Sequence, residues 1–261
     1  MKDFREYILV GGMPQAIDAF IETKDFGRVD FVKQNILSLY ESDIGVQKEE
    51  NPTYIKNIIE HIPSELSKHD KTYIISHVDP NARLREYKGP IGWLNEAMIV
   101  NISENVNDPS VAINLSTIDP SFKCYLMDTG LLISLAYKNK DYLENDLYEK
   151  ILFDKLHVNE GMIIENVIAQ AIRSHDENCY FFKKTDKDSK KTVAEIDFLI
   201  RRENKIIPIE AKSSVAESIK SLKLFKKTYS NKIGTQLILY DGDIKRNEEI
   251  IYLPYFMAFV I

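Results

Sequence analysis

The chain has 261 residues, of which 44% are hydrophobic and 28% are charged, and its formal net charge is −6. This length and apolar content are sufficient for two domains with buried cores, and they exclude an intrinsically disordered chain. A net negative charge also argues against a generally basic nucleic-acid-binding protein.

The apolar runs, the two cysteines and the five histidines argue against a membrane, secreted or zinc-binding protein. Apolar runs such as residues 255–261 are too short to span a bilayer, and the N-terminus has no signal-peptide core, so we expect a cytoplasmic protein. Cys124 and Cys179 lie far apart in apolar surroundings, which predicts buried free thiols in a reducing compartment. The five histidines show no ligand-like spacing, which argues against a zinc site.

The first part of the chain has the apolar periodicity of helices. Helices are predicted at residues 14–21, 30–40, 54–66 and 83–97. Strands are predicted at residues 98–102 and 111–115, with a turn at 105–109 between them. Helices followed by such a two-stranded ribbon resemble a winged helix. Arg83, Arg85 and Lys88 would then face phosphates, although winged helices also serve as protein-contact modules.

Residues 122–137 predict a short strand and a helix that lead towards a second domain. Asp128 directly precedes the apolar helix 130–136, which makes it the expected N-cap rather than a catalytic acid. The polar stretch 141–145 is the predicted connection between the domains. We therefore expect a helical, winged-helix-like domain over residues 1–140 and a second domain over 141–261.

Two neighbouring strands are predicted in the second domain, at residues 194–200 and 207–212, with the polar segment 201–205 as their turn. Because side chains alternate along a strand, Ile196, Phe198 and Ile200 are expected on one face and Glu195 and Asp197 on the other. Glu210 and Lys212 share a face of the next strand for the same reason. If Ile200 pairs with Ile207, the antiparallel register places Asp197 opposite Glu210.

Two opposed carboxylates require a cation or a shared proton. At about 4 Å they repel by roughly 4 kcal/mol in an effective dielectric near 20. A hard divalent cation with oxygen ligands, Mg²⁺ or Mn²⁺, meets this requirement at Asp197 and Glu210. The competing interpretation is a solvated sheet face, on which alternating charges are common.

A third acid lies on the helix predicted at residues 160–172. Its apolar stripe contains Ile164, Val167, Ile168, Ala171 and Ile172, and Glu165 lies beside that stripe. A glutamate at such a boundary is most often solvent-facing. Its position before the two-strand motif makes Glu165 a candidate for the same site.

The positive charge is concentrated around this motif. Residues 173–232 contain 15 Lys and Arg against 9 Asp and Glu, a net charge of +6, which leaves −12 for the rest of the chain. The lysines form two groups, Lys183, Lys184, Lys187, Lys190 and Lys191 at a predicted hairpin and Lys220, Lys223, Lys226 and Lys227 along a predicted helix. Such groups either follow a phosphate backbone or form ordinary solvated surface.

Glu165, Asp197 and the segment Glu210-Ala211-Lys212 together resemble the PD-(D/E)xK nuclease superfamily. The wider chain resembles the uncharacterised C-terminal region that follows the ATPase module of many bacterial and archaeal AAA-type ATP-binding proteins. The segments that carry this resemblance are residues 9–16, 39–40 with 43–44, 122–132 and 161–170 and the two strand motifs. No proline precedes Asp197, which departs from the superfamily pattern.

The resemblance implies a restriction-endonuclease-like mixed sheet flanked by helices, an α+β or α/β fold. Asp197 and Glu210 would hold Mg²⁺ or Mn²⁺, Glu165 would add a ligand or orient a water, and Lys212 would position the attacking water. The chain has no phosphate-binding loop of the Gly-x-x-x-x-Gly-Lys-Ser/Thr type, so we do not expect it to hydrolyse ATP. It is either the C-terminal part of a longer protein or a stand-alone remnant.

Two functions remain open at this point. The first is a divalent-metal-dependent phosphodiesterase that acts on nucleic acid, with DNA favoured over RNA. The second is a non-catalytic module in which an inherited nuclease-like fold binds nucleic acid or a partner protein, such as an ATPase module. Substrate type and oligomeric state are not fixed by the sequence.

Overall fold

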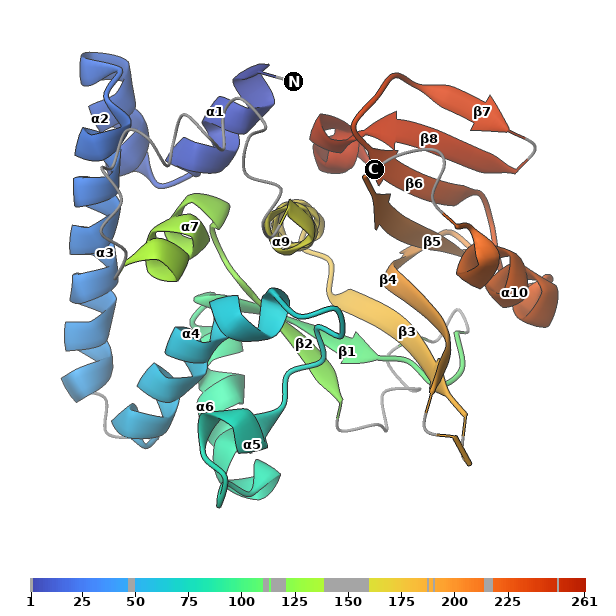
Figure 1. Cartoon of the computed structure of the whole chain (residues 1–261), viewed down its shortest axis with the longest axis horizontal. Coiled ribbons are helices and arrows are strands. Elements are labelled where there is room, and N and C mark those ends of the chain that lie inside the picture. Colours follow the sequence, from blue (N-terminus) through green and yellow to red (C-terminus); the bar gives the residue numbers. More distant parts are fainter. Residues whose placement is uncertain are drawn as a thin grey trace. The chain divides into compact units, whose positions relative to one another are not determined.

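The computed structural model describes residues 2–46, 50–109, 113, 121–138, 160–186, 188–189, 191–213, 218–247 and 249–261. They form two compact units (Figure 1). Unit 1 consists of Met1–Asn101 and Cys124–Gln170, and unit 2 consists of Ile102–Lys123 and Ala171–Ile261. Each unit is therefore built from two stretches of chain, whereas the predicted division into domains lies at a single point between residues 140 and 141.

Unit 1 is mainly helical. In the described part of unit 1, the helices are α1 (Lys2–Val10), α2 (Pro14–Thr23), α3 (Phe26–Val46), α4 (Pro52–Leu66), α5 (Ile75–Val78), α6 (Leu84–Glu96) and α7 (Thr129–Tyr137). Helix α9 (Glu160–Ser174) runs from unit 1 into unit 2. The helices predicted at 14–21, 30–40, 54–66 and 83–97 are confirmed, with boundaries shifted by a few residues. Helices α2 and α3 pack side by side (Figure 1).

Asp128 links the start of α7 to the turn between α1 and α2. Its carboxylate accepts hydrogen bonds from the backbone N–H of Leu131, at 2.8 Å, and of Gly12, at 2.6 Å. The predicted N-cap role is thus confirmed, and the same side chain also binds a turn 116 residues away along the chain. Burial raises the pKa of Asp128 above its usual value, which these two donors and the nearby Lys33 oppose.

Lys33 of α3 is a second buried charge at this junction. Its ammonium donates to the carbonyl oxygen of Leu9 at 2.7 Å and to that of Gly130 at 3.2 Å. Burial lowers the pKa of Lys33 to about 8, although Asp30 and Asp128 favour its charged form. Lys33 therefore ties the last turn of α1 to the first turn of α7, since both carbonyl groups lie at helix ends.

Two glycines allow the close approach at this junction. Gly11 has a φ of +81°, and a Cβ atom placed there would collide with the carboxylate of Asp128. A Cβ atom at Gly130 would lie 2.7 Å from the backbone of Gly11. The α1–α2 turn and the α7 N-terminus thus pack backbone against backbone, which only glycine permits at these two positions.

The strands belong to one mixed eight-stranded sheet in the order β2-β1-β3-β4-β5-β6-β8-β7. Their bounds are β1 (Val100–Asn105), β2 (Phe122–Leu126), β3 (Cys179–Thr185), β4 (Thr192–Arg202), β5 (Lys205–Lys212), β6 (Gln236–Tyr240), β7 (Lys245–Asn247) and β8 (Ile250–Pro254). The pairs β1–β3, β5–β6 and β6–β8 are parallel, and the pairs β3–β4, β4–β5 and β7–β8 are antiparallel. Most of this sheet lies in unit 2.

The core of unit 2 forms between the sheet and α10 (Lys220–Tyr229). Leu222 and Phe225 of this helix are buried in a cluster with residues of β3, β4, β5, β6 and β8. Phe225 packs edge-on against Phe182 of β3, with ring centroids 4.9 Å apart. The lysines of α10 alternate with these apolar residues, so the helix is amphipathic. A 3-10 helix, Tyr255–Val260, follows β8.

The expected mixed α+β architecture is confirmed, but its finer assignments to a winged helix and to a restriction-endonuclease-like sheet are not. Strand β1 lies between β2 and β3 and pairs with β3 through Ser103, Glu104 and Asn105. The strand predicted at 111–115 falls, apart from residue 113, outside the described residues. The expected pairing of 98–102 with 111–115 therefore stays a prediction.

Both cysteines are buried free thiols, as predicted. Within the described part of the chain, no helix combines the length and the apolar character that crossing a lipid bilayer requires.

The close packing of the α1–α2 turn against α7 predicts that alanine substitutions at Gly11 and Gly12 change the free energy of unfolding by very different amounts. Gly11→Ala should lower the free energy of unfolding by about 3 kcal/mol, because it adds left-handed backbone strain to overpacking against Asp128. Gly12→Ala is the matched control, since its added Cβ atom would lie 3.5 Å from the nearest atom of Asp128, an ordinary contact. Urea unfolding measures both. Equal midpoints for the two variants would contradict the proposed role of Gly11.

Candidate functional site

Strands β4 and β5 form the predicted hairpin in the predicted register. Ile200 pairs with Ile207, as expected, and the last pair of the ladder is Phe198 with Ile209. Asp197 and Glu210 follow directly beyond that pair. The two candidate carboxylates therefore lie on adjacent strands at the point where regular pairing of β4 with β5 ends.

A bulge in β4 sets the position of Asp197. Towards β3, the register shifts between the pair Tyr180–Leu199 and the pair Phe182–Ile196, so β4 has one extra residue there. Ile196 and Leu199 consequently lie in the same core cluster, which three residues of a regular strand would not allow. The predicted alternation of 196, 198 and 200 on one face is therefore wrong, because the bulge changes the phase of the strand.

The carboxylate of Asp197 is held against the backbone of β5. Its Oδ2 accepts a hydrogen bond from the N–H of Ala211, the residue after Glu210, at 2.9 Å. The side chain of Asp197 retains about 19% exposure. Asp197 is therefore fixed beside Glu210 and still accessible from solvent.

Glu210 is the most perturbed acid of this region. The residue is only 1% exposed, and the Lys212 ammonium lies 2.9 Å from its Oε2, an ion pair by distance without hydrogen-bond geometry. Among the described residues, neither carboxylate oxygen of Glu210 has a hydrogen-bond partner. Burial, followed by the charge of Asp197, raises the pKa of Glu210 to about 7, and Lys212 opposes this shift. Such a buried and incompletely satisfied acid is typical of functional sites.

Lys123 of β2 was not anticipated as part of this site. It is 1% exposed, its ammonium lies 2.9 Å from Glu195 Oε1 and 3.9 Å from Asp197 Oδ1, and it lies 5.1 Å from the centroid of the Phe181 ring. All five residues of β2 are buried. A lysine inside a fully buried strand requires an acidic partner, and this was the available signal in the sequence.

Glu165 belongs to unit 1, where other groups occupy its carboxylate. Lys71 lies 2.8 Å from its Oε1, and the Tyr125 hydroxyl donates to its Oε2 at 2.9 Å. Glu165 is buried, so the solvent-facing alternative is wrong. The predicted convergence of Glu165 with Asp197, Glu210 and Lys212 stays a prediction.

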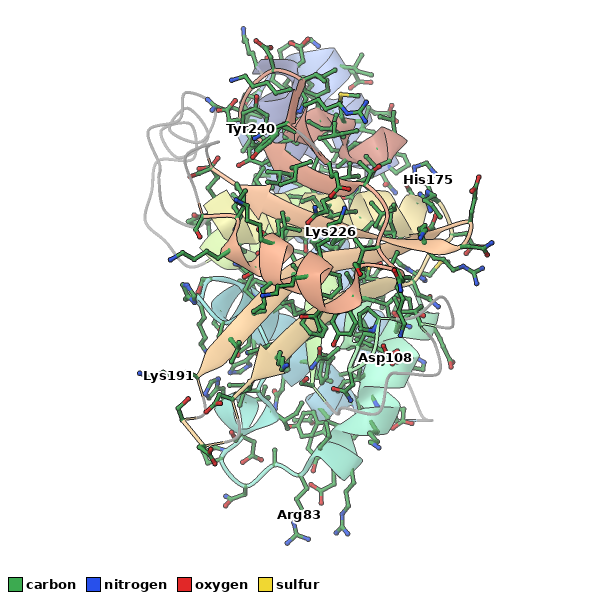
Figure 2. All side chains as sticks on the ribbon, turned by 90° about the vertical axis from the view of Figure 1, so that its right-hand side faces the viewer. Arg83, Asp108, His175, Lys191, Lys226 and Tyr240 are labelled. Atoms are coloured by element: carbon green, nitrogen blue, oxygen red, sulfur yellow. The ribbon has the colours of Figure 1, made fainter. Side chains whose placement is uncertain are left out.

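The basic groups lie on the surface of unit 2. Lys184 and Lys191 of the β3–β4 hairpin are exposed and Lys183 is half-buried, whereas Lys187 and Lys190 lie outside the described residues. On α10, Lys220, Lys223 and Lys227 are exposed, and Lys226 forms an ion pair with Glu249. Figure 2 shows Lys191 at the outer edge of the hairpin.

The positive side chains predicted to face phosphates in unit 1, Arg83, Arg85 and Lys88, are all exposed at α6. Arg83 extends away from the molecule (Figure 2).

The donors of unit 2 suit a hard cation with few protein ligands. No group of three or more His, Cys, Asp and Glu side chains in the described part of the chain is arranged to hold a metal ion. Asp197 and Glu210 nevertheless supply two carboxylates, one buried without a hydrogen-bond partner and one partly open. Mg²⁺ in proteins is often bound by one or two carboxylates and several waters, so this pair fits it.

Two family models match the chain. Residues 1–142 match a family described as a domain of unknown function (DUF8612), and residues 160–256 match another described as a domain of unknown function (DUF4143). The second domain often occurs at the C-terminus of AAA-ATPase-like proteins, which agrees with part of the resemblance stated above. No curated protein matches the chain, and no solved structure matches it.

The raised pKa of Glu210 predicts a pH-dependent stability in metal-free protein. The folded state binds this proton up to about pH 7, whereas the unfolded state releases it near 4.5. The stabilisation from this group is therefore present below pH 4.5 and is lost as the pH rises through 7, a change of roughly 3 kcal/mol. Relative to Glu210→Gln, the wild-type free energy of unfolding should fall by this amount between pH 4.5 and pH 8.

Urea unfolding with EDTA at several pH values provides the measurement. Glu104→Gln, which removes an exposed carboxylate of β1, serves as the control. A difference between wild type and Glu210→Gln that is constant with pH would show that Glu210 ionises normally.

Proposed function

We propose that this chain, which belongs to the family described as a domain of unknown function (DUF8612), carries a divalent-metal-dependent phosphodiesterase site in unit 2. The proposal includes a nuclease-like core of the PD-(D/E)xK type, built on β4 and β5. The residues of the proposed site, Asp197, Glu210 and Lys212, lie in the segment that matches the DUF4143 model.

The observation that carries the proposal is the environment of Glu210. A carboxylate that is 1% exposed, lies beside a second acid and has an oxygen without a hydrogen-bond partner is costly to a fold. The ammonium of Lys212 compensates the negative charge at Glu210 Oε2. A cation held between Glu210 and Asp197 would compensate the remaining negative charge and the acceptor that has no hydrogen bond.

The proposed roles follow from these positions. Asp197 and Glu210 would hold Mg²⁺ or Mn²⁺, and Lys212, two residues along β5, would orient the attacking water and offset negative charge that develops on the phosphate. When bound, the metal ion would supply Lewis-acid stabilisation of the phosphoryl oxygens. Glu165 is not assigned to metal binding, because Lys71 and Tyr125 already engage both of its oxygens.

The proposed substrate is a nucleic acid. The exposed lysines of the β3–β4 hairpin and of α10 belong to the same unit as Asp197 and Glu210, and clustered lysines bind a phosphate backbone without reading its sequence. A partner ATPase module is a further proposal, supported by the frequent position of the second domain behind AAA-ATPase-like modules.

Cleavage by matched variants tests the function. Wild type should cleave single-stranded or duplex DNA or RNA in Mg²⁺ or Mn²⁺, and Asp197→Ala should lower the rate at least about a hundredfold through loss of a metal ligand. Nucleic-acid affinity should stay unchanged or rise, since the substitution removes a negative charge near the phosphate path. Glu104→Gln, which removes an exposed carboxylate of the same sheet, should cleave like wild type.

Absence of cleavage on all four substrates, with no divalent-ion binding by calorimetry, would reject the enzyme. The alternative function, a non-catalytic module that binds nucleic acid or a partner protein, would then replace it. Loss of both cleavage and nucleic-acid binding in Asp197→Ala would instead point to a damaged fold, which circular dichroism would reveal.

The hairpin lysines give a separate prediction about binding. Neutralising Lys183, Lys184, Lys190 and Lys191 to glutamine should reduce the slope of log affinity against log salt by roughly 0.9 for each phosphate group of duplex DNA that the variant no longer neutralises. Fluorescence anisotropy at several salt concentrations measures the slope. Lys2→Gln with Lys24→Gln, both exposed in unit 1, is the control. An unchanged slope in the hairpin variant would show that these lysines do not contact phosphate groups.

A further inference from the structure

Lys123 is a buried cation for which the proposed function has not accounted. Its ammonium contacts Glu195 at 2.9 Å and lies 3.9 Å from Asp197, and the Phe181 ring lies 5.1 Å away. A buried lysine is expensive unless an acid pairs with it. Here the paired acids, Glu195 and Asp197, keep 24% and 19% side-chain exposure, so solvent and ions reach them from the outside while Lys123 reaches them from the interior.

The charges of this region come close to balance. Among the described residues, three carboxylates, Glu195, Asp197 and Glu210, face two ammonium groups, Lys123 and Lys212, which leaves one net negative charge when all five groups are ionised. One divalent cation would change the net charge to +1, which a phosphate group offsets. Two divalent cations would raise it to +3 within a few ångströms, which is strongly repulsive in a partly buried site.

The partners of the carboxylate oxygens in this region are also consistent with a single cation. Glu195 Oε1 contacts Lys123, Asp197 Oδ2 accepts from Ala211, and Glu210 Oε2 faces Lys212. Within these three carboxylates, Glu210 Oε1 is a fully buried acceptor that has neither a hydrogen bond nor an ion pair among the described residues. A single divalent cation between Glu210 and Asp197 would satisfy this acceptor.

We propose that Lys123 is a built-in cation of this site, which keeps Asp197 and Glu195 in place and limits the site to a single divalent cation. This inference rests on the proposed function, because it concerns the same carboxylates. Lys123 is a positioning residue: it acts through Asp197 and Glu195, and it stands where a second metal ion would otherwise bind.

Counting bound Mn²⁺ tests this inference without measuring cleavage. Calorimetry and electron paramagnetic resonance of free Mn²⁺ should both give one equivalent for wild type. Lys123→Met leaves Glu195 and Asp197 without their ammonium, so it should bind a second equivalent and hold the first at least about tenfold more tightly. Lys123→Arg keeps the charge and should retain one equivalent. Lys205→Met, an exposed lysine at the far end of β5, is the control and should behave like wild type.

Each result separates this inference from the proposed function. Two equivalents in wild type, or Lys123→Met that binds like wild type, would overturn the role of Lys123 while Mg²⁺-dependent cleavage still supports the phosphodiesterase. One equivalent in wild type and two in Lys123→Met, without cleavage of any substrate, would support Lys123 and reject the enzyme. Wild type that binds no Mn²⁺ overturns the inference directly. If Lys123→Met fails to fold, Lys123→Gln, which also removes the charge, replaces it: a second equivalent would support the role of Lys123, and one equivalent would overturn it.

Discussion

Buried charge must be paired, and this constraint organises both units of the protein. A lysine or carboxylate taken out of water costs several kcal/mol unless hydrogen bonds or an opposite charge compensate it. In unit 1, Lys33 binds two carbonyl groups at helix ends, and Asp128 binds two backbone N–H groups. In unit 2, Lys123 and Lys212 face three acids. At the α1–α2 and α7 junction, backbone groups compensate these charges, whereas neither oxygen of Glu210 has a hydrogen-bond partner among the described residues.

Local patterns were enough to predict the elements and one register. The period of apolar residues identified the long helices, and the polar turn between two apolar strands identified the β4–β5 hairpin with its Ile200–Ile207 pair. The N-cap at Asp128 followed from its place before an apolar helix. These features depend on residues close together in the sequence, for which propensity and periodicity are informative.

Features that depend on distant residues could not be predicted in the same way. The bulge in β4 arises from its pairing with β3, and no glycine or proline marks it. The role of Lys123 depends on Glu195, 72 positions later in the chain, and the role of Lys71 depends on Glu165, 94 positions later. Only the folded structure shows which acid each lysine contacts. A lysine in an apolar strand signals that some acid must be near it, but not which one. The candidate site was therefore predicted by its acids and Lys212, and its second cation was missed.

The composition of unit 1 from two stretches of chain has a consequence for its synthesis. Lys33 is synthesised 97 residues before its partner Gly130, and Gly12 is synthesised 116 residues before its partner Asp128. At about 5–20 residues per second, the early helices emerge from the ribosome roughly 6–20 s before these partners exist. During that interval the apolar faces of α1 and α3 lack α7, the helix against which they pack in the finished unit. Nascent chains of this protein should therefore expose these apolar faces to chaperones until α7 has been synthesised, a demand that the folded molecule no longer shows.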